Sequence, residues 1–151
     1  MRLLEIDNRN TFADVIDGIA QIDSDIFSSN QWGRDSLADS AENDYDYLVA
    51  AIDEDNREPV GFGLLRVFDD AEVIRIAVDP NMRRNGIGRS ILNSMLKETQ
   101  NRNVENVFLE VRSGNTAARA LYEGAGFVSE GIRKGYYSDP VEDAVIMRFT
   151  C

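Results

Sequence analysis

Histidine is absent from the sequence, and the only cysteine, Cys151, is the last residue. A chain of this composition cannot build a Ser-His-Asp triad, a Cys-His nucleophile or a Cys/His zinc site. A CxxC redox pair and an internal disulfide are excluded as well. Any general base must therefore be a carboxylate, an amine, a tyrosine or a chain of water molecules.

Basic residues are also few. Sixteen Lys and Arg residues stand against 27 Asp and Glu residues, which gives a formal net charge of −11. This charge repels a phosphate backbone, so we expect no nucleic-acid partner and a cationic substrate instead. Acidity that only aids solubility is the alternative explanation of the same composition.

Long hydrophobic runs are missing. The sequence has no stretch of about 18 consecutive apolar residues, the length that a membrane-spanning helix needs. The opening residues, MRLLEIDNRN, become polar and acidic too soon for the apolar core of a secretory signal. We expect a cytoplasmic protein without a membrane partner.

The length and apolar content are typical of one compact domain. At 151 residues and 43% hydrophobic content the chain can bury a real core, so we expect residues 1–151 to form a single domain. Apolar β-rich runs predict strands at 2–6, 47–52, 60–68, 73–78, 107–111, 127–128, 132–137 and 144–149. Helical spacing predicts helices at 35–42, 87–102 and 116–125, and a first helix that begins behind Asn8 or Asn10 with Phe12 on its apolar face. Short turns join the strands between 47 and 78, which predicts that these strands are antiparallel.

A glycine-containing segment, R-R-N-G-I-G at residues 83–88, lies between a predicted strand and a predicted amphipathic helix. Backbone N–H groups at such a helix start converge on an anion, and two glycines let the backbone approach a phosphate closely. Arg83, Arg84 and Arg89 add positive charge to an otherwise acidic chain. The pattern predicts a pyrophosphate site, and the alternative is a glycine-rich helix entry with solvated arginines that binds nothing.

A dinucleotide-binding fold is a second interpretation of the same glycines. Glu110 lies 22 residues beyond Gly88, near the position of a ribose-binding carboxylate. Ile91, however, stands where the third glycine of that motif belongs. The glycines also follow a predicted antiparallel meander and do not open a βαβ unit, so we disfavour this fold.

The R-R-N-G-I-G segment resembles the Q/R-x-x-G-x-G/A acyl-CoA-binding motif of the GNAT N-acetyltransferases. Further segments resemble the bacterial ribosomal-protein alanine N-acetyltransferases: L-E-V-R at 109–112, Asn115, A-L-Y at 120–122, G-F at 126–127, R-K-G-Y-Y at 133–137 and E-D-A-V-I-M at 142–147. The resemblance covers about half of the chain, from Arg75 to the end. It implies an α/β (α+β) GNAT fold with a mixed, mostly antiparallel sheet of about six to seven strands and about four flanking helices. Two parallel central strands, ending near Val78 and Val111, would splay apart in this fold.

The resemblance also implies acetyl-CoA as co-substrate, with no metal. Backbone groups of Ile76, Ala77 and Val78 would contact the pantetheine arm and the thioester. The residues implied for the rest of acetyl-CoA are Arg83, Arg84, Asn85, Gly86, Ile87, Gly88, Arg89 and Asn115. Asn115 is alternatively a helix N-cap, and both roles are compatible.

Two side chains are implied for the chemistry, Glu110 as proton acceptor for the amine and Tyr122 as proton donor to the leaving sulfur. Amine attack on a thioester needs a neutral amine and a protonated leaving thiolate, and a tyrosine with a reference pKa of about 10 is protonated at neutral pH. The alternatives are that Glu110 is a solvated residue near a strand end and that Tyr122 is a core aromatic.

The acceptor is indicated less directly. Phe27 and Trp32 resemble an F-x-W segment that lines the peptide site of the alanine acetyltransferases, here lengthened by residues 28–31 and without the proline before Trp. Tyr136 and Tyr137 would wall the substrate groove or pack on opposite faces of a strand. At neutral pH about 10% of an α-amine is unprotonated, against about 0.04% of a lysine amine, which favours the N-terminus of a protein, such as a ribosomal protein. A lysine or small-molecule amine and a non-catalytic acyl-CoA-binding role are the alternatives, and the chain is expected to be a monomer or a homodimer.

Overall fold

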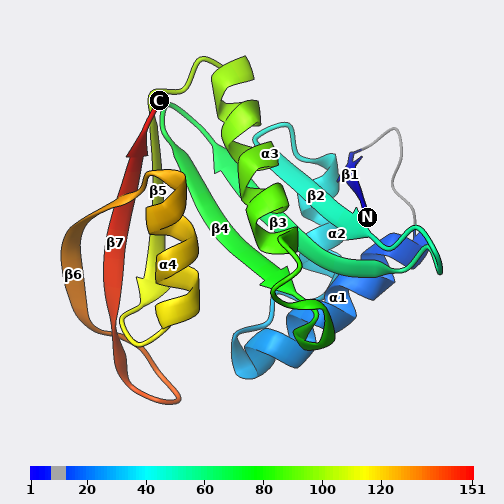
Figure 1. Ribbon diagram of the computed structural model, residues 1–151, viewed down its shortest axis with the longest axis horizontal. Helices are drawn as coiled ribbons and strands as arrows, with labels where there is room; N and C mark the ends of the chain where they lie inside the picture. The colour runs from blue at the N-terminus through cyan, green and yellow to red at the C-terminus, as the bar shows by residue number, and fades with distance from the viewer. Residues whose placement is uncertain (8–12) are drawn as a thin grey trace.

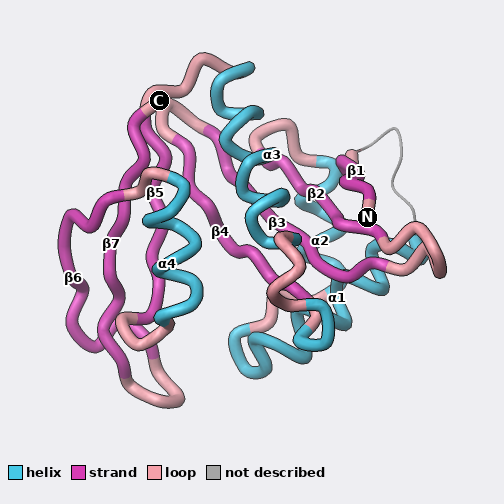
Figure 2. Tube along the Cα trace, in the orientation of Figure 1, coloured by secondary structure: helices cyan, strands magenta, loops and turns pink. Residues whose placement is uncertain are grey.

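The computed structural model describes residues 1–7 and 13–151, which form an α/β structure with one seven-stranded sheet (Figures 1 and 2). In chain order the elements are β1 (Arg2–Ile6), α1 (Ala13–Phe27), a 3-10 turn (Ser28–Asn30), α2 (Arg34–Glu42), β2 (Asp46–Ile52), β3 (Pro59–Val67), β4 (Ala71–Val78), a 3-10 turn (Pro80–Met82), α3 (Ile87–Asn101), β5 (Asn106–Arg112), α4 (Thr116–Ala125), β6 (Val128–Tyr137) and β7 (Glu142–Thr150). The predicted caps Asn8 and Asn10, and Phe12, lie outside the described residues. No helix within the described ranges is long and apolar enough to cross a membrane.

The strand order is β1-β2-β3-β4-β5-β7-β6. Strands β1 to β4 are antiparallel neighbours, as the short turns predict, and β7 is antiparallel to both β5 and β6. The prediction of separate strands at 127–128 and 132–137 was wrong. Residues Val128–Tyr137 form one strand, because the pairing of β6 with β7 continues past an irregularity between Ser129 and Gly131.

The only parallel neighbours described in the sheet are β4 and β5, and they pair briefly. Ala71 pairs with Val107 and Glu72 pairs with Phe108, and no further register partners join the two strands over their described length. Figure 1 shows β4 and β5 diverging from this point. The expected pair of splayed central strands is therefore confirmed.

One premise in the argument against a dinucleotide-binding fold was also wrong. The glycines do open a βαβ unit, since α3 connects the parallel strands β4 and β5. The fold still differs from a doubly wound parallel sheet, because every other pair of neighbouring strands is antiparallel. Ile91, at the position of the missing third glycine, is fully buried in the core.

A hydrophobic layer lies on each face of the sheet. Residues of α3 and α4 pack with one face, and residues of α1 and α2 pack with the other, in front of and behind the sheet in Figure 1. Helix α3 approaches β3 closely because β3 carries glycines. A Cβ atom on Gly63 would lie 2.5 Å from Ile91 Cγ2, and one on Gly61 would lie 3.3 Å from Ile91 Cδ1. Strand β3, the neighbour of β4, is thus packed directly against α3.

Candidate active site

A cleft of about 630 Å³ lies where β4 and β5 separate. Its walls are the segment after α1, strands β4 and β5, the first turns of α4 and the end of β6. Of the residues predicted for the site, the cleft brings together Trp32, Ile76, Glu110, Asn115, Tyr122, Tyr136 and Tyr137. Ala77, Val78 and residues 83–89 are not among the described lining residues and lie in the rest of β4, in the turn after it and at the start of α3.

The turn before α3 has a backbone suited to an anion. Gly86 adopts the left-handed conformation, with φ of 75°, which a glycine reaches without strain. The first described intrahelical bond runs from Ser90 N–H to Gly86 O, 3.0 Å, so the earlier N–H groups of the helix have no intrahelical acceptor. Arg83 and Arg84 are exposed beside this turn.

Gly88, in the first turn of α3, packs beside apolar side chains. A Cβ atom there would meet Leu121 Cδ2 at 3.5 Å and Val78 Cγ2 at 3.7 Å, which are ordinary contacts. The fold itself therefore does not require glycine at 88. Arg89, also in the first turn of α3, donates from Nη2 to Gly124 O at 3.2 Å and so caps the end of α4 as well.

Glu110 projects from β5 into the cleft, with 21% of its side chain exposed. Its Oε1 lies 3.3 Å from Arg133 Nε, an ion pair across the sheet to β6. Hydrogen bonding to this carboxylate raises the pKa of Tyr136, whose ring also packs under the Arg133 guanidinium at 5.5 Å. The carboxylate is therefore neither isolated nor fully solvated, and it faces the cleft together with a tyrosine and an arginine.

Tyr122, on α4, is both a core residue and a cleft residue. Its side chain is buried and packs edge-on against Phe127, with ring centroids 5.7 Å apart. Its hydroxyl has no hydrogen-bond partner among the described residues, and the residue lines the cleft. Burial, with a smaller contribution from Tyr137, raises the pKa of Tyr122 to about 12, so the hydroxyl holds its proton at neutral pH.

Asn115 caps α4, as one of its two predicted roles required. Its side-chain oxygen accepts a hydrogen bond from Ala118 N–H at 3.1 Å. The residue also lines the cleft. The two roles therefore remain compatible at this position.

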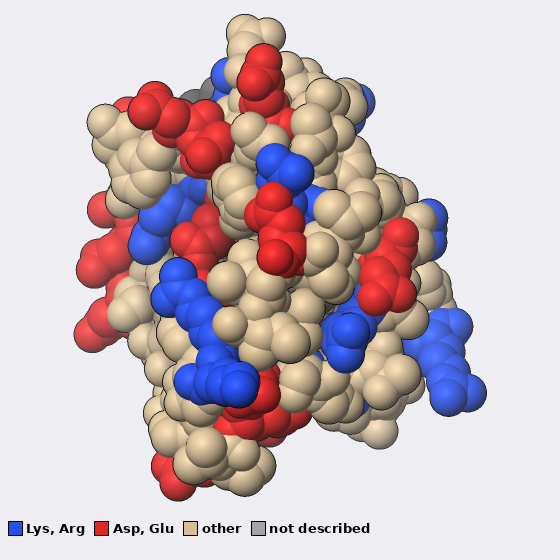
Figure 3. Space-filling view, turned by 90° about the vertical axis from the view of Figure 1, so that its left-hand side faces the viewer, with Lys and Arg blue, Asp and Glu red and all other residues tan. Residues whose placement is uncertain are grey.

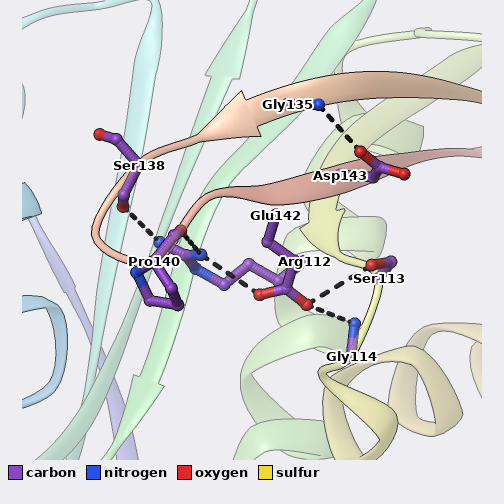
Figure 4. A network of polar contacts seen from close by, with 8 residues as sticks. All are labelled: Arg112, Ser113, Gly114, Gly135, Ser138, Pro140, Glu142 and Asp143. Carbon is purple, nitrogen blue, oxygen red and sulfur yellow. Dashed lines mark hydrogen bonds and ion pairs between the residues drawn. The ribbon is translucent and has the colours of Figure 1, made fainter.

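The turn between β6 and β7 is held against the end of β5 by Arg112 (Figure 4). Its Nη1 donates to Pro140 O at 3.1 Å and to Glu142 Oε1 at 3.2 Å, and its Nη2 donates to Ser138 O at 3.1 Å. The guanidinium also lies over the Tyr137 ring, 4.5 Å from its centroid. This arrangement places the tyrosine pair of β6 beside Glu110.

Two carboxylates on β7 complete the same network. Glu142 Oε2 accepts a hydrogen bond from Gly114 N–H at 2.6 Å, and this bond, followed by Arg112, lowers the pKa of Glu142. Asp143 Oδ1 accepts from Gly135 N–H at 2.8 Å. Burial, and next the charge of Glu110, raise the pKa of Tyr137 to about 12.

Sequence reasoning missed the pair that fixes the opposite wall. Asp23 is fully buried, and it accepts hydrogen bonds from Trp32 N–H at 2.6 Å, Gly33 N–H at 3.3 Å and Arg75 Nη1 at 2.6 Å. The longer segment between Phe27 and Trp32 closes as a 3-10 turn beneath these bonds. The available signal was a carboxylate on the apolar face of α1 and a single arginine within the apolar run of β4.

The surface around β6, one of the two edge strands of the sheet, carries charges of both signs. Figure 3 shows small groups of basic and acidic side chains separated by uncharged surface on this side of the molecule. Among residues 1–7 and 13–151, no group of three or more acidic or cysteine side chains is arranged to hold a metal ion. Among the residues that line the cleft, Glu110, Tyr122, Tyr136 and Tyr137 carry groups that can accept or donate a proton.

The chain is similar to acetyltransferases over most of its length. The acetyltransferase (GNAT) family model matches residues 16–127. A putative ribosomal protein bS18-alanine N-acetyltransferase of Bacillus subtilis is 35% identical over 144 residues, 94% of this chain and 93% of that protein. The bS18-alanine N-acetyltransferase of Escherichia coli is 47% identical over 83 residues, which span 54% of this chain and 56%, about half, of that relative.

Solved structures agree in fold. The crystal structure of the ribosomal-protein-S18-alanine N-acetyltransferase from Escherichia coli has a TM-score of 0.82 and 29% identity, over 99% of this chain and 92% of the other. A ribosomal-protein-alanine N-acetyltransferase from Brucella melitensis has a TM-score of 0.84 at 20% identity, over all of both chains, and supports the fold alone. The chain belongs to the acetyltransferase (GNAT) family.

Proposed function

We propose that this protein transfers the acetyl group of acetyl-CoA to the N-terminal α-amine of a protein. The observation that carries the proposal is the cleft between the splayed strands, where Glu110 and Tyr122 face one space from different elements. The similarity to alanine N-acetyltransferases supports the reaction class, and it makes an N-terminal alanine of a ribosomal protein the leading acceptor. Such an acceptor would be met in the cytoplasm.

Acetyl-CoA would bind on the α3 and α4 side of the cleft. The free N–H groups at the start of α3 and the guanidinium groups of residues 83, 84 and 89 would hold its pyrophosphate, and Asn85, Gly86 and Ile87 would complete that turn. The backbone of Ile76, Ala77 and Val78 would contact the pantetheine arm, and Asn115 the same ligand. When bound, acetyl-CoA supplies the acyl thioester, and no metal is needed for this step.

Glu110 would accept the proton of the amine, directly or through a water molecule, as the amine attacks the thioester carbonyl. Tyr122 would donate its proton to the sulfur as the thiolate leaves. A pKa of about 12 keeps Tyr122 protonated, and a thiol pKa of about 8.5 makes the thiolate a weaker base than the tyrosinate. Tyr122 therefore holds its proton at the start of each turnover. Because the tyrosinate is a stronger base than the thiolate, it would be reprotonated from water after the transfer, and Glu110 would return the amine proton to water, which balances the step.

The acceptor peptide would enter from the other side of the sheet. Trp32 on one wall and Tyr136 and Tyr137 on the other would flank its first residues. One carboxylate base is sufficient for an α-amine, because about a tenth of that amine is already unprotonated at pH 7. The amine of a lysine side chain is almost fully protonated at this pH, so its deprotonation needs a stronger base or a lowered amine pKa. We propose a single domain acting as a monomer or a homodimer.

The direct test offers three acceptors to the purified protein with acetyl-CoA. These are a peptide with a free N-terminal alanine and no lysine, the same sequence with a blocked N-terminus and one lysine, and a polyamine. Mass spectrometry locates any acetyl group that is added. We expect modification of the first peptide alone. Acetylation of the lysine peptide or of the polyamine alone would replace the leading acceptor, and loss of acetyl transfer to all three would remove the proposed activity.

A further inference from the structure

Glu110 lies on the face of the sheet that is opposite α3 and α4. Its neighbours in β5, Leu109 and Val111, are buried in the core layer that contains residues of those two helices. Successive side chains of a strand point to opposite faces, so the carboxylate of Glu110 points to the other side of the sheet. Arg133 of β6 lies on the same side, because Glu110 and Arg133 are opposite β7 residues that are two positions apart.

The ion pair between these two side chains is held at the surface. Arg133 Nε lies 3.3 Å from Glu110 Oε1, and 56% of the Arg133 side chain is exposed, against 21% for Glu110. The guanidinium lies 5.5 Å from the centroid of the Tyr136 ring, which is itself exposed. An exposed ion pair contributes little to stability. Arg133 can therefore leave Glu110 at a small cost in free energy.

The acceptor amine needs the place that Arg133 occupies beside the carboxylate. At pH 7 about 90% of a peptide α-amine is protonated, so most of the acceptor arrives as an ammonium group. An ammonium group that gives its proton directly to Glu110 must first approach the carboxylate as a hydrogen-bond donor. Two cations beside one carboxylate repel each other, and the exposed guanidinium is free to move into solvent. The two groups therefore compete for Glu110.

A second carboxylate, that of Glu72, is available to Arg133. Glu72 lies in β4, in register with the β5 residue two positions before Glu110, and thus on the same face of the sheet. Partial burial, and next the negative charge of Glu110, raise the pKa of Glu72. The charges of Arg66 and Arg133 lower this pKa, so both arginines lie within electrostatic range of the carboxylate. Arg66 is already bonded to Asp46 through two nitrogens, at 2.8 Å and 3.0 Å, which leaves Arg133 as the cation for Glu72.

We propose that the ammonium group of the acceptor displaces Arg133 from Glu110, and that Arg133 then pairs with Glu72. The proposal rests on the proposed function, because it takes Glu110 as the group that receives the amine. Two carboxylates stand against one guanidinium in this cluster, an excess of one negative charge that one ammonium group neutralises. After the exchange each carboxylate has its own cation. Arg133 does not contact the substrate and acts on the reaction through Glu110.

The test measures by calorimetry how tightly a peptide with a free N-terminal alanine binds to the protein loaded with CoA. Arg133→Met removes the guanidinium and keeps an unbranched side chain over the Tyr136 ring. Arg148→Met is the matched control. Arg148 of β7 forms a similar cross-strand ion pair with Glu130 of β6, at 3.0 Å and with 39% of its side chain exposed, and it is not among the described residues that line the cleft. Thermal unfolding checks that both variants are folded, and kcat is measured for each with acetyl-CoA.

Arg133→Met should bind the alanine peptide about twofold to fivefold more tightly than the wild-type protein, the range that corresponds to the loss of one competing exposed ion pair. Its kcat should stay within about twofold of the wild-type value, because Arg133 has left Glu110 once the acceptor is bound. An equal gain in Arg148→Met would overturn the proposal, since the general surface charge would then be the cause. Unchanged or weaker binding by Arg133→Met, or a lower kcat, would also overturn it, because Arg133 would then orient Glu110.

Glu72→Gln tests the second part of the exchange. This change removes the partner to which Arg133 moves, so it should weaken peptide binding about twofold or more further in the wild-type background than in Arg133→Met. Equal weakening in the two backgrounds would show that Arg133 does not move to Glu72. Acetylation of the alanine peptide by the wild-type protein separates the two proposals. If this activity is present and Arg133→Met changes nothing, only the exchange is wrong, whereas absence of the activity would overturn both.

Discussion

Replacing Tyr122 by phenylalanine tests the proposed proton donor with little structural disturbance. The change removes one hydroxyl group and keeps the ring that packs edge-on against Phe127. Because this hydroxyl has no hydrogen-bond partner among the described residues, its loss leaves no buried group unpaired. We therefore expect the variant to fold with stability close to that of the wild-type protein, so that a change in turnover reports on chemistry.

The size of the effect follows from the role of the hydroxyl. Removal of a positioned general acid lowers the rate by about 100-fold or more, which corresponds to roughly 2.7 kcal/mol of activation free energy. The pKa of Tyr122, raised to about 12, adds a second expectation. At pH 10 about 1% of such a tyrosine is ionised, against about half of one with the ordinary pKa of 10. The wild-type kcat should therefore show no loss from tyrosine ionisation up to about pH 10.

The assay measures kcat at saturating acetyl-CoA and peptide, by thiol release or by single-turnover quench. Measurements run from about pH 7 to pH 10, because a Tyr122 pKa of about 12 and an ordinary tyrosine pKa of about 10 predict different values of kcat at the upper end of this range. Tyr47→Phe is the matched control, since Tyr47 is also buried but its hydroxyl bonds to Ser94 Oγ at 2.6 Å, outside the cleft. Full kcat in Tyr122→Phe under conditions where chemistry limits the rate would refute the assignment. A fall of wild-type kcat by half near pH 10 that Tyr122→Phe lacks would show that burial does not hold the proton as argued.

Three further predictions concern other parts of the site. Glu110→Gln should lower kcat/KM most near neutral pH and progressively less towards about pH 9, because an α-amine acceptor loses its proton unaided as the pH rises. A loss of kcat/KM that does not change with pH would instead indicate that Glu110 positions the amine. Gly88→Asp should weaken acetyl-CoA binding by about 10-fold or more in calorimetry, because it puts a negative charge in the proposed phosphate site. The control, Gly88→Ala, adds only a Cβ atom with ordinary contacts and should bind acetyl-CoA more tightly than the aspartate variant. Glu142→Gln should lower the Tm at neutral pH. Because the folded-state pKa of Glu142 lies below its ordinary 4.5, the stabilisation is present above about pH 4.5 and is lost as the pH falls through the folded pKa, so the Tm difference should vanish in acid.

Most of the fold could be predicted because local signals agreed with the tertiary structure. Helix α4 begins and ends where its cap residues indicate, with Asn115 at its start and the left-handed Gly126 at its end. Strand β6 was divided wrongly, because nine of its ten residues are exposed and give no alternating apolar pattern. The extent of β6 is set by its pairing with β7, and the spacing of apolar residues within β6 does not contain this information.

The site was only partly predictable for a related reason. Motifs located Glu110 and Tyr122, which are 12 positions apart and meet at one cleft only because β5 leaves β4 after a brief pairing. Asp23 and Arg75 are 52 positions apart, and no local spacing connects them. In sequence Arg75 is a single basic residue in an apolar run, and Asp23 is one of two aspartates near the end of α1. Only the packing of α1 on the sheet makes Asp23 and Arg75 an ion pair.

The two walls of the cleft are built on the same principle and differ in how deeply the charge pair is buried. On each wall an arginine from a central strand stacks on an aromatic ring, pairs with a carboxylate and donates to a backbone carbonyl of the loop. Arg75 does so with Phe27, Asp23 and Asn30 O, and Arg112 does so with Tyr137, Glu142 and Ser138 O. Asp23 is fully buried, whereas 25% of the Glu142 side chain is exposed.

This difference in burial decides which wall can respond to its surroundings. Salt screens exposed charge pairs and leaves buried ones nearly unaffected, and only a partly exposed carboxylate exchanges its proton readily with solvent. Because Asp23 is fully buried, we expect the wall after α1 to respond little to salt or to pH. The β6–β7 wall, which carries the tyrosines beside Glu110, is the one whose position depends on Glu142 remaining ionised.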